Sequence, residues 1–301
     1  MTIRLNPNPL PDLLTAIQQS DQNVNTAEQQ LSSGLKVNQL SDNPAAASSD
    51  VLNRNQYSQD DQFLQNISTL QSRFQVADST LSNVVTALTR AVSLGTEGAT
   101  GTLSTQDRQA ITAEVQGVQT QVASLANTQS QGTYLFAGTA VNTQPFTIDT
   151  TTGAVTYNGN AGVASTQLSN GNSINTNLPG SQLFQNASGS VFGSLQDLVT
   201  ALQSNNTTTI GTAVTEVQNA LSTLDTQRVF YGNALNQINQ SESFLNQDQL
   251  NLSTQQNALV AADPATAASD LVQATTDNQA ILSATGRVLS LPNLLSFLPT
   301  P

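Results

Sequence analysis

The strongest pattern in the sequence is an apolar residue at every seventh position in the C-terminal half. The residues are Ile210, Val217, Leu224, Tyr231, Ile238, Leu245, Leu252 and Leu259. An apolar heptad is typical of a helix that packs against other helices along its length. A continuous helix over this span would be about 75 Å long. The positions four residues further on include Arg228, Glu242 and Gln249, which suit a two-stranded zipper poorly, so the pattern predicts an intramolecular bundle.

A second heptad, between residues 67 and 91, predicts the partner helix of that bundle. The two heptads define a predicted bundle seam of Ile67, Phe74, Leu81, Leu88, Ile210, Val217, Leu224, Ile238, Leu245 and Leu252. A third amphipathic helix is expected over 111–125. Ser104 and Asp107 precede it with the spacing of a capping box.

Both chain ends carry shorter apolar stripes. Leu10, Ile17, Val24 and Leu31 repeat every seven residues, and Gly34 follows as a C-cap. The last stripe includes Leu271, Ile281, Val288 and Leu291. Asn43-Pro44 and Asp263-Pro264 each place a capping residue and a proline before an Ala-rich helix start. The echo predicts paired terminal helices that extend beyond a common bundle.

The segment between the helical parts is rich in Gly, Thr, Asn and Ser. Short runs at 133–137, 145–149 and 154–158 have the composition of β-strands. Residues 150–153 are expected to form a turn, and Asn170-Gly171 favours a hairpin with a type I′ turn.

These patterns predict a mainly α fold, a long-helix bundle or coiled coil built from both chain ends with a small β-rich domain inserted in the middle. The expected parts are terminal assembly helices (1–44 and 263–301), a helical bundle domain (45–131 and 194–262) and the insert (132–193).

Composition excludes several functions. Only 9% of the residues are charged and the net charge is −12, so the basic surface that binds nucleic acid or anionic lipid is missing. No stretch is apolar enough to span a membrane, and the N-terminus lacks the pattern of a cleaved signal peptide. Without histidine or cysteine, the usual catalytic triads and imidazole metal sites are excluded. We therefore expect no enzyme, no cofactor and no metal.

Several segments resemble those of the flagellins and flagellar hook-associated junction proteins. The run EQQLSSGLKVNQLSDNPAAASSD (28–50) resembles their shared N-terminal signature. Pro44, with Gln29 and Gln30 upstream, is more like the hook-associated protein 3 branch than the flagellins. The insert, GTYLFAGTAVNTQPFTID (132–149) with GAVTYNGNAG (153–162), and the C-terminal run from Ala274 to Leu298 are similar to the same family.

The resemblance implies a structural role outside the cell, at the junction between flagellar hook and filament. It implies export through the flagellar type III apparatus with the help of an export chaperone. The implied partners are copies of the same chain in a ring, the other hook-associated junction protein and flagellin. The expected assembly interface lies on the terminal helices, at Leu10, Ile17, Val24, Leu31, Leu271, Ile281, Val288, Leu291, Leu294 and Leu298.

Two alternatives remain open. The chain could be a flagellin filament subunit of the same architecture, which a filament-scale copy number would reveal. In a different class, it could be a secreted adhesin or binding module that uses the β insert, which binding of a glycan or host protein by residues 132–193 would reveal.

Overall fold

The structure is a computed structural model that describes residues 10–149, 152–186 and 189–289. The chain divides into two compact units. One contains residues 1–59 and 248–301 and is called here the terminal unit; the other contains residues 60–247 and is called the bundle unit. Two long helices contribute to both: α2 (Pro44–Gly98) and α6 (Thr207–Val260). The three-part division expected from the sequence stays a prediction.

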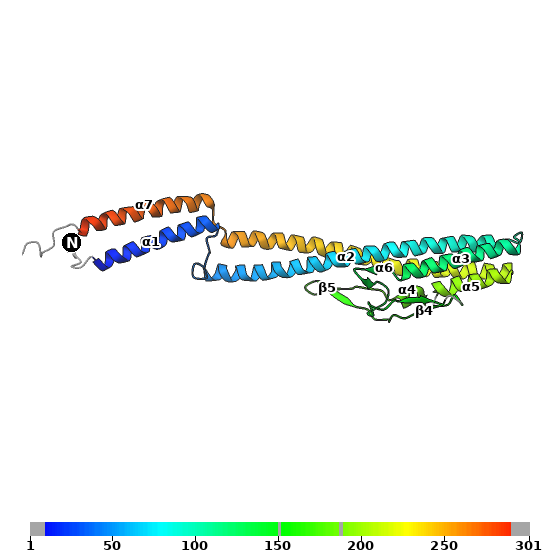
Figure 1. The fold of residues 1–301 in the computed structure, drawn as a ribbon. Coiled ribbons are helices and arrows are strands. Elements are labelled where there is room, and N and C mark those ends of the chain that lie inside the picture. The colour runs from blue at the N-terminus through cyan, green and yellow to red at the C-terminus, as the bar shows by residue number, and fades with distance from the viewer. Residues whose placement is uncertain (1–9, 150–151, 187–188, 290–301) are drawn as a thin grey trace, which may run out of the picture. The chain divides into compact units, whose positions relative to one another are not determined.

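The described residues are mainly helical, as the heptads predicted (Figure 1). Besides α2 and α6, the helices are α1 (Leu10–Ser33), α3 (Thr105–Ala126), α4 (Gly180–Phe184), α5 (Val191–Ser204) and α7 (Pro264–Leu289). The strands are β1 (Gln129–Ser130), β2 (Thr133–Tyr134), β3 (Phe146–Ile148), β4 (Val155–Tyr157), β5 (Ser165–Ser169), β6 (Asn172–Asn175), β7 (Gln185–Asn186) and β8 (Gly189–Ser190). Within the described part of the chain, no helix has the length and apolarity needed to cross a bilayer.

The helices start where local chemistry predicts. Asn43 Oδ1 accepts a hydrogen bond from the Ala46 backbone N–H at 3.0 Å, and α2 begins at Pro44. The capping box of α3 is formed, with Ser104 and Asp107 satisfying each other's backbone N–H. Gly34 takes a φ of +70°, which ends α1 at low steric cost.

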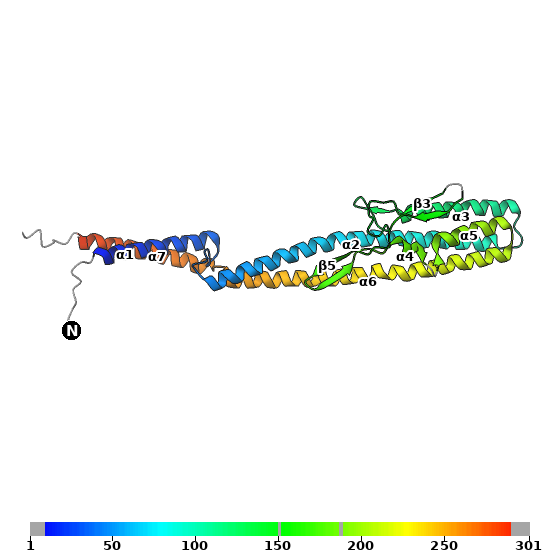
Figure 2. The ribbon, with the colours of Figure 1, turned by 90° about the horizontal axis from the view of Figure 1, so that it is seen from below.

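The bundle unit has one continuous apolar core between α2, α3, α5 and α6 (Figures 1 and 2). Every residue of the predicted seam is buried. They are Ile67, Phe74, Leu81, Leu88, Ile210, Val217, Leu224, Ile238, Leu245 and, in the terminal unit, Leu252. The side chains of Phe74, Phe230 and Tyr231 meet edge to face in this core, with centroids 5.1–6.0 Å apart.

The insert consists of four separate two-stranded antiparallel hairpins, namely β1–β2, β3–β4, β5–β6 and β7–β8. A hairpin alone buries too little to be stable. Here the β3–β4 hairpin joins an aromatic cluster, in which Phe146 lies 5.2 Å from Phe184 of α4 and 5.1 Å from Phe192 of α5. Phe136 and Phe184 are fully buried in the same core as the helices. The insert is therefore stabilised by the bundle on which it packs.

The Asn170-Gly171 hairpin forms, but the type I′ turn predicted for it is wrong. A type I′ turn needs positive φ at both central residues. Gly171 has a φ of +81°, while Asn170 is not among the described non-glycine residues with positive φ. The register of β5 shifts between Gln167 and Ser169, and such irregularities increase the local twist. That twist removes the need for a primed turn.

The primed geometry occurs instead between β1 and β2. The connecting residues Gln131 and Gly132 have φ values of 51° and 78°. Both lie in the left-handed region that type I′ requires. The sequence gives only a weak signal for this turn, because glutamine rarely takes positive φ.

Candidate assembly surface

Helices α1 and α7 lie side by side in the terminal unit (Figures 1 and 2). The residues buried between them are small: Ser20, Ala27 and Ala267 are each no more than 5% exposed. Small residues allow two helices to approach closely, but they remove little apolar surface from water. A side-chain hydrogen bond crosses the pair, from Asn278 Nδ2 to Asp21 Oδ1 at 2.7 Å.

The pair is held at one end by a short backbone ladder. The Lys36 N–H donates to the Val260 carbonyl at 2.8 Å, and the Ala262 N–H donates to the Gly34 carbonyl at 2.9 Å. Lys36 Nζ also donates to the Ala258 carbonyl at 3.0 Å. The segments that follow α1 and α6 are thereby joined. The ladder lies between the residues just after α1 and those at the end of α6.

The side chains of the predicted interface residues that the structure describes are only partly buried. Ile17, Val24, Leu271 and Ile281 are half-buried, and Leu31 is exposed. Each therefore keeps apolar surface available to a partner. The side chains of Leu10 and Val288, and the residues Leu291, Leu294 and Leu298, lie outside what the structure describes.

Further apolar side chains are exposed on the terminal unit, and some of them lie outside the heptad positions. Leu14 is 60% exposed on α1, and Val272 and Leu282 are 66% and 51% exposed on α7. Val272 and Leu282 directly follow the stripe residues Leu271 and Ile281. A helix places adjacent residues about 100° apart, so these side chains widen the apolar stripe beyond what one partner helix can cover. Leu40, Val51, Leu52 and Leu250 are exposed in the same unit.

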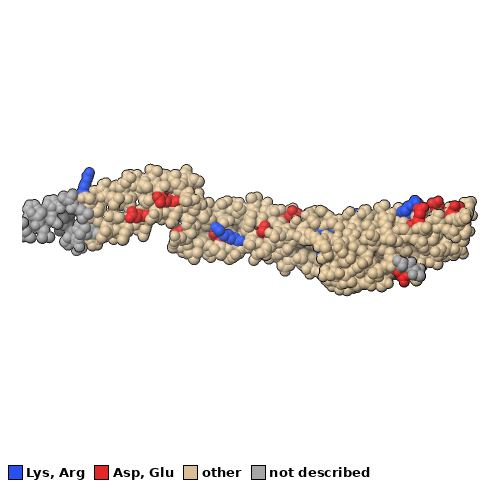
Figure 3. Space-filling model, viewed as in Figure 1, with Lys and Arg blue, Asp and Glu red and all other residues tan. Residues whose placement is uncertain are grey.

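Charge is sparse on the face shown in Figure 3. Ion pairs among the described residues include Arg54–Asp50, Arg90–Glu114 and Arg228–Asp78. On α1 and α7 the described charges are a few acidic groups, including Asp21 and Asp277, together with Arg287. A surface with so little charge approaches an identical surface with little electrostatic cost. The terminal unit thus offers an apolar surface with few charges, most of them acidic.

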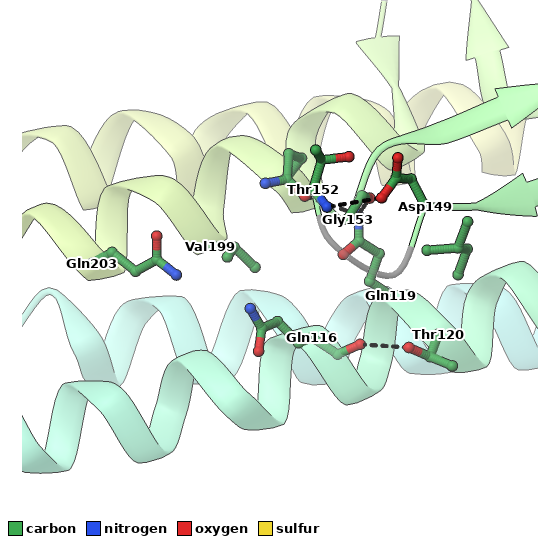
Figure 4. Close-up of a pocket in the computed structure, with 10 residues that line it drawn as sticks. Gln116, Gln119, Thr120, Asp149, Thr152, Gly153, Val199 and Gln203 are labelled. Atoms are coloured by element: carbon green, nitrogen blue, oxygen red, sulfur yellow. Dashed lines mark hydrogen bonds between the residues drawn. The ribbon is translucent and has the colours of Figure 1, made fainter.

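The bundle unit has a cavity of about 480 Å³ lined by polar side chains (Figure 4). It lies between α3, α5 and the turn after β3. Gln119 Nε2 donates to the Gly153 carbonyl at 3.0 Å and to Gln196 Oε1 at 3.3 Å. The first bond attaches the β3–β4 hairpin to α3, and the second joins α3 to α5. Among the described residues, no cluster of three metal-ligating side chains occurs here or elsewhere.

Comparison with known proteins shows which proteins the chain resembles. Residues 11–141 match the bacterial flagellin N-terminal helical region. The chain is 31% identical over 157 residues to flagellar hook-associated protein 3 of Salmonella typhimurium, covering 52% of this chain and 48% of that protein. The chain is therefore similar to the flagellar hook-associated proteins and has a flagellin-like N-terminal helical region. Flagellar hook-associated protein 3 of Escherichia coli is 34% identical over 119 residues, covering 39% of this chain and 38% of that protein.

The matched region spans about half or less of these hook-associated relatives. The fold is also that of the flagellar junction protein FlgL from Legionella pneumophila. The TM-score is 0.61 at 16% identity, covering 71% of this chain and 100% of that one. At that identity the likeness concerns the fold alone. The long-helix bundle with a small β insert, predicted from the sequence, is confirmed as the fold that the chain shares with this junction protein.

Proposed function

We propose that this protein is a structural part of the bacterial flagellum that joins the hook to the flagellin filament. It does so as an assembled subunit and catalyses no reaction. The observation that carries the proposal is the α1–α7 pair of the terminal unit. Ile17, Val24, Leu271 and Ile281 are only half-covered, while the seam of the bundle unit is closed.

The two units differ in how completely they bury their apolar side chains, and this difference supports separate roles for them. In the bundle unit, seam residues such as Phe74, Leu81 and Val217 are fully buried by the chain itself. In the terminal unit, Leu14, Val272 and Leu282 remain more than half exposed. Contiguous exposed apolar surface on a soluble protein marks an interaction site. The terminal unit is the part that a neighbouring subunit completes, and the bundle unit is the rigid body that carries it.

The partners proposed for this surface follow from the resemblance to the hook-associated proteins. They are copies of the same chain in a ring, with the other hook-associated junction protein on one side and flagellin on the other. Before assembly, the same α7 surface is covered by an export chaperone. The protein then leaves the cell through the flagellar export channel. Its working place is the extracellular flagellum.

Electron microscopy of a strain lacking the gene tests the function. Hooks without filaments, with intact flagellin released into the medium, are the expected result, and the wild-type gene on a plasmid should restore filaments. If the chain were itself the filament subunit, its deletion would remove that flagellin, and none of it would appear in the medium. If the chain were an adhesin, deletion of its gene would leave the flagella unchanged. Either of these two outcomes contradicts the proposal.

A further inference from the structure

The chain contains two Asn-Gly pairs, Asn158-Gly159 and Asn170-Gly171, and both asparagines are exposed. Such pairs can lose the side-chain amide without an enzyme. The backbone nitrogen of the glycine attacks Cγ of the asparagine, and a C–N bond forms. The side-chain nitrogen leaves as ammonia with the proton of the glycine N–H. One water molecule then opens the cyclic imide to aspartate or isoaspartate. Water is the only co-reactant.

The geometry around Asn170 leaves this reaction unobstructed. Asn170 stands at the tip of the β5–β6 hairpin, between the paired residues Ser169 and Asn172. No hydrogen bond among the described residues holds its side chain. Nothing lies within 4 Å of the point where a Cβ on Gly171 would sit, so the chain is not crowded at this glycine. Glycine itself adds no side chain to hinder the attack.

Asn158 has the same exposure and the same following residue, but it is held. Its Nδ2 donates to Thr147 Oγ1 at 3.1 Å, and its backbone N–H donates to the Pro145 carbonyl at 2.8 Å. Gly159 lies against the ring of Tyr157, which occupies the place of a Cβ. Cγ of Asn158 cannot turn toward the next nitrogen until these contacts break.

We propose that Asn170 is a site of spontaneous deamidation in the native protein, and that the fold protects Asn158. Conversion to isoaspartate inserts one backbone atom into the two-residue turn and adds a negative charge. The damage stays at the tip, because Leu168 and Ile174 are buried below it. Asn177 also ties the base of the hairpin, accepting from the Ala164 N–H at 2.8 Å and donating to the Gly162 carbonyl at 3.0 Å.

Ageing of the purified full-length protein at mildly alkaline pH, followed by peptide mass spectrometry, tests the proposal. Chymotryptic cleavage after Tyr157, Leu168 and Leu183 separates the two asparagines into different peptides. In the native protein, Asn170 should convert at least about 5–30-fold faster than Asn158, the factor expected for one or two hydrogen bonds that must first break. In denaturant the two rates should become similar, because only the fold distinguishes the sites.

Two variants sharpen the test. N170Q should abolish the reaction at this position, because the longer side chain would require a larger ring. Thr147→Val removes the acceptor for Asn158 and should accelerate that site while leaving the rate at Asn170 unchanged. Equal rates at both asparagines in the folded protein, or a slower rate at Asn170, would overturn the proposal. So would a native-state difference that persists unchanged in denaturant.

Discussion

The rings of Phe74 and Tyr231 pack edge to face across the seam between α2 and α6, with centroids 5.5 Å apart and planes at 80°. Both residues are at most 2% exposed. Aromatic pairs in this geometry contribute beyond the area they bury. The contact fixes the register of the two long helices in the bundle unit. It also places a phenol in a site that disfavours its charged form.

The stability of the bundle unit should therefore fall at alkaline pH. Burial raises the pKa of Tyr231 above its ordinary value of 10.0, against the smaller effects of a backbone hydrogen bond at Leu178 and of Arg73. A phenol with a raised pKa favours the folded state fully below pH 10, and this contribution is lost as the pH rises further. Urea denaturation across this range measures the effect.

Tyr231→Phe is the matched control for the alkaline effect. It should cost about 1 kcal/mol at neutral pH for the lost hydroxyl contact, and its stability should fall less above pH 10. Some pH dependence should remain, because burial also raises the pKa of Tyr157. Identical pH profiles for the wild type and the variant would contradict this account.

The ion pair between Arg228 and Asp78 should make a small, salt-sensitive contribution. Arg228 Nε lies 2.7 Å from Asp78 Oδ1 and Nη2 lies 3.1 Å from Oδ2, with both side chains about one-third exposed. Asp78→Asn should lower the free energy of unfolding by up to ~1 kcal/mol at low salt. Glu114→Gln, which removes the more exposed pair with Arg90, should cost less. Chemical denaturation at two salt concentrations compares the variants; an equal or larger loss for Glu114→Gln would be inconsistent with the prediction.

Two glycines with the same backbone conformation should differ in their tolerance of a side chain. Gly132 and Gly138 have φ values of 78° and 72°. A Cβ on Gly132 would meet nothing, while one on Gly138 would meet the Asn160 carbonyl. Gly132→Ala should cost about 1–2 kcal/mol from backbone strain alone, and Gly138→Ala should cost clearly more. Thermal unfolding of both variants checks this; equal losses would mean that strain decides alone.

The terminal helices should open before the bundle in the isolated protein. The α1–α7 pair buries mainly small side chains, so local unfolding there costs less free energy than in the bundle unit. Limited proteolysis should remove α1 and α7 first and leave a fragment that contains residues 60–247. Mass spectrometry of the time course identifies the cuts. Early cleavage within α3 or α5 would be the contrary result.

The surface of α7 should be needed both for chaperone binding and for junction formation. Ile281→Glu places a charge on the half-buried stripe, and burial of an isoleucine contributes about 1.5–3 kcal/mol. Binding of the cognate export chaperone, measured by calorimetry, and swimming should both weaken. Ser283→Glu, on an exposed position about 200° around the helix, is the control and should change neither. Wild-type binding and swimming by Ile281→Glu would rule out this role for α7.

Local sequence chemistry determined much of this protein. Periodic apolar residues determined where the long helices form. A heptad repeat places its apolar side chains along one side of a helix, and that side is buried against other helices. Asn43 with Pro44 and Ser104 with Asp107 determined where two of the helices begin, because a cap satisfies backbone groups within four residues of itself. The composition of the insert indicated hairpins, because a hairpin too is formed by residues close together in the sequence.

Only the tertiary structure decided the rest, because the deciding contacts join residues far apart in the chain. The turn at Asn170 depends on the bulge in β5 and on Asn172, which accepts from Gln237 of α6 at 3.2 Å. Gln119 is buried where its side-chain amide donates to the Gly153 carbonyl and to Gln196 of α5. The apolar stripe of α7 is visible in the sequence. Which face of α7 stays exposed depends on how the helix packs against α1, where small residues such as Ala27 and Ala267 are buried.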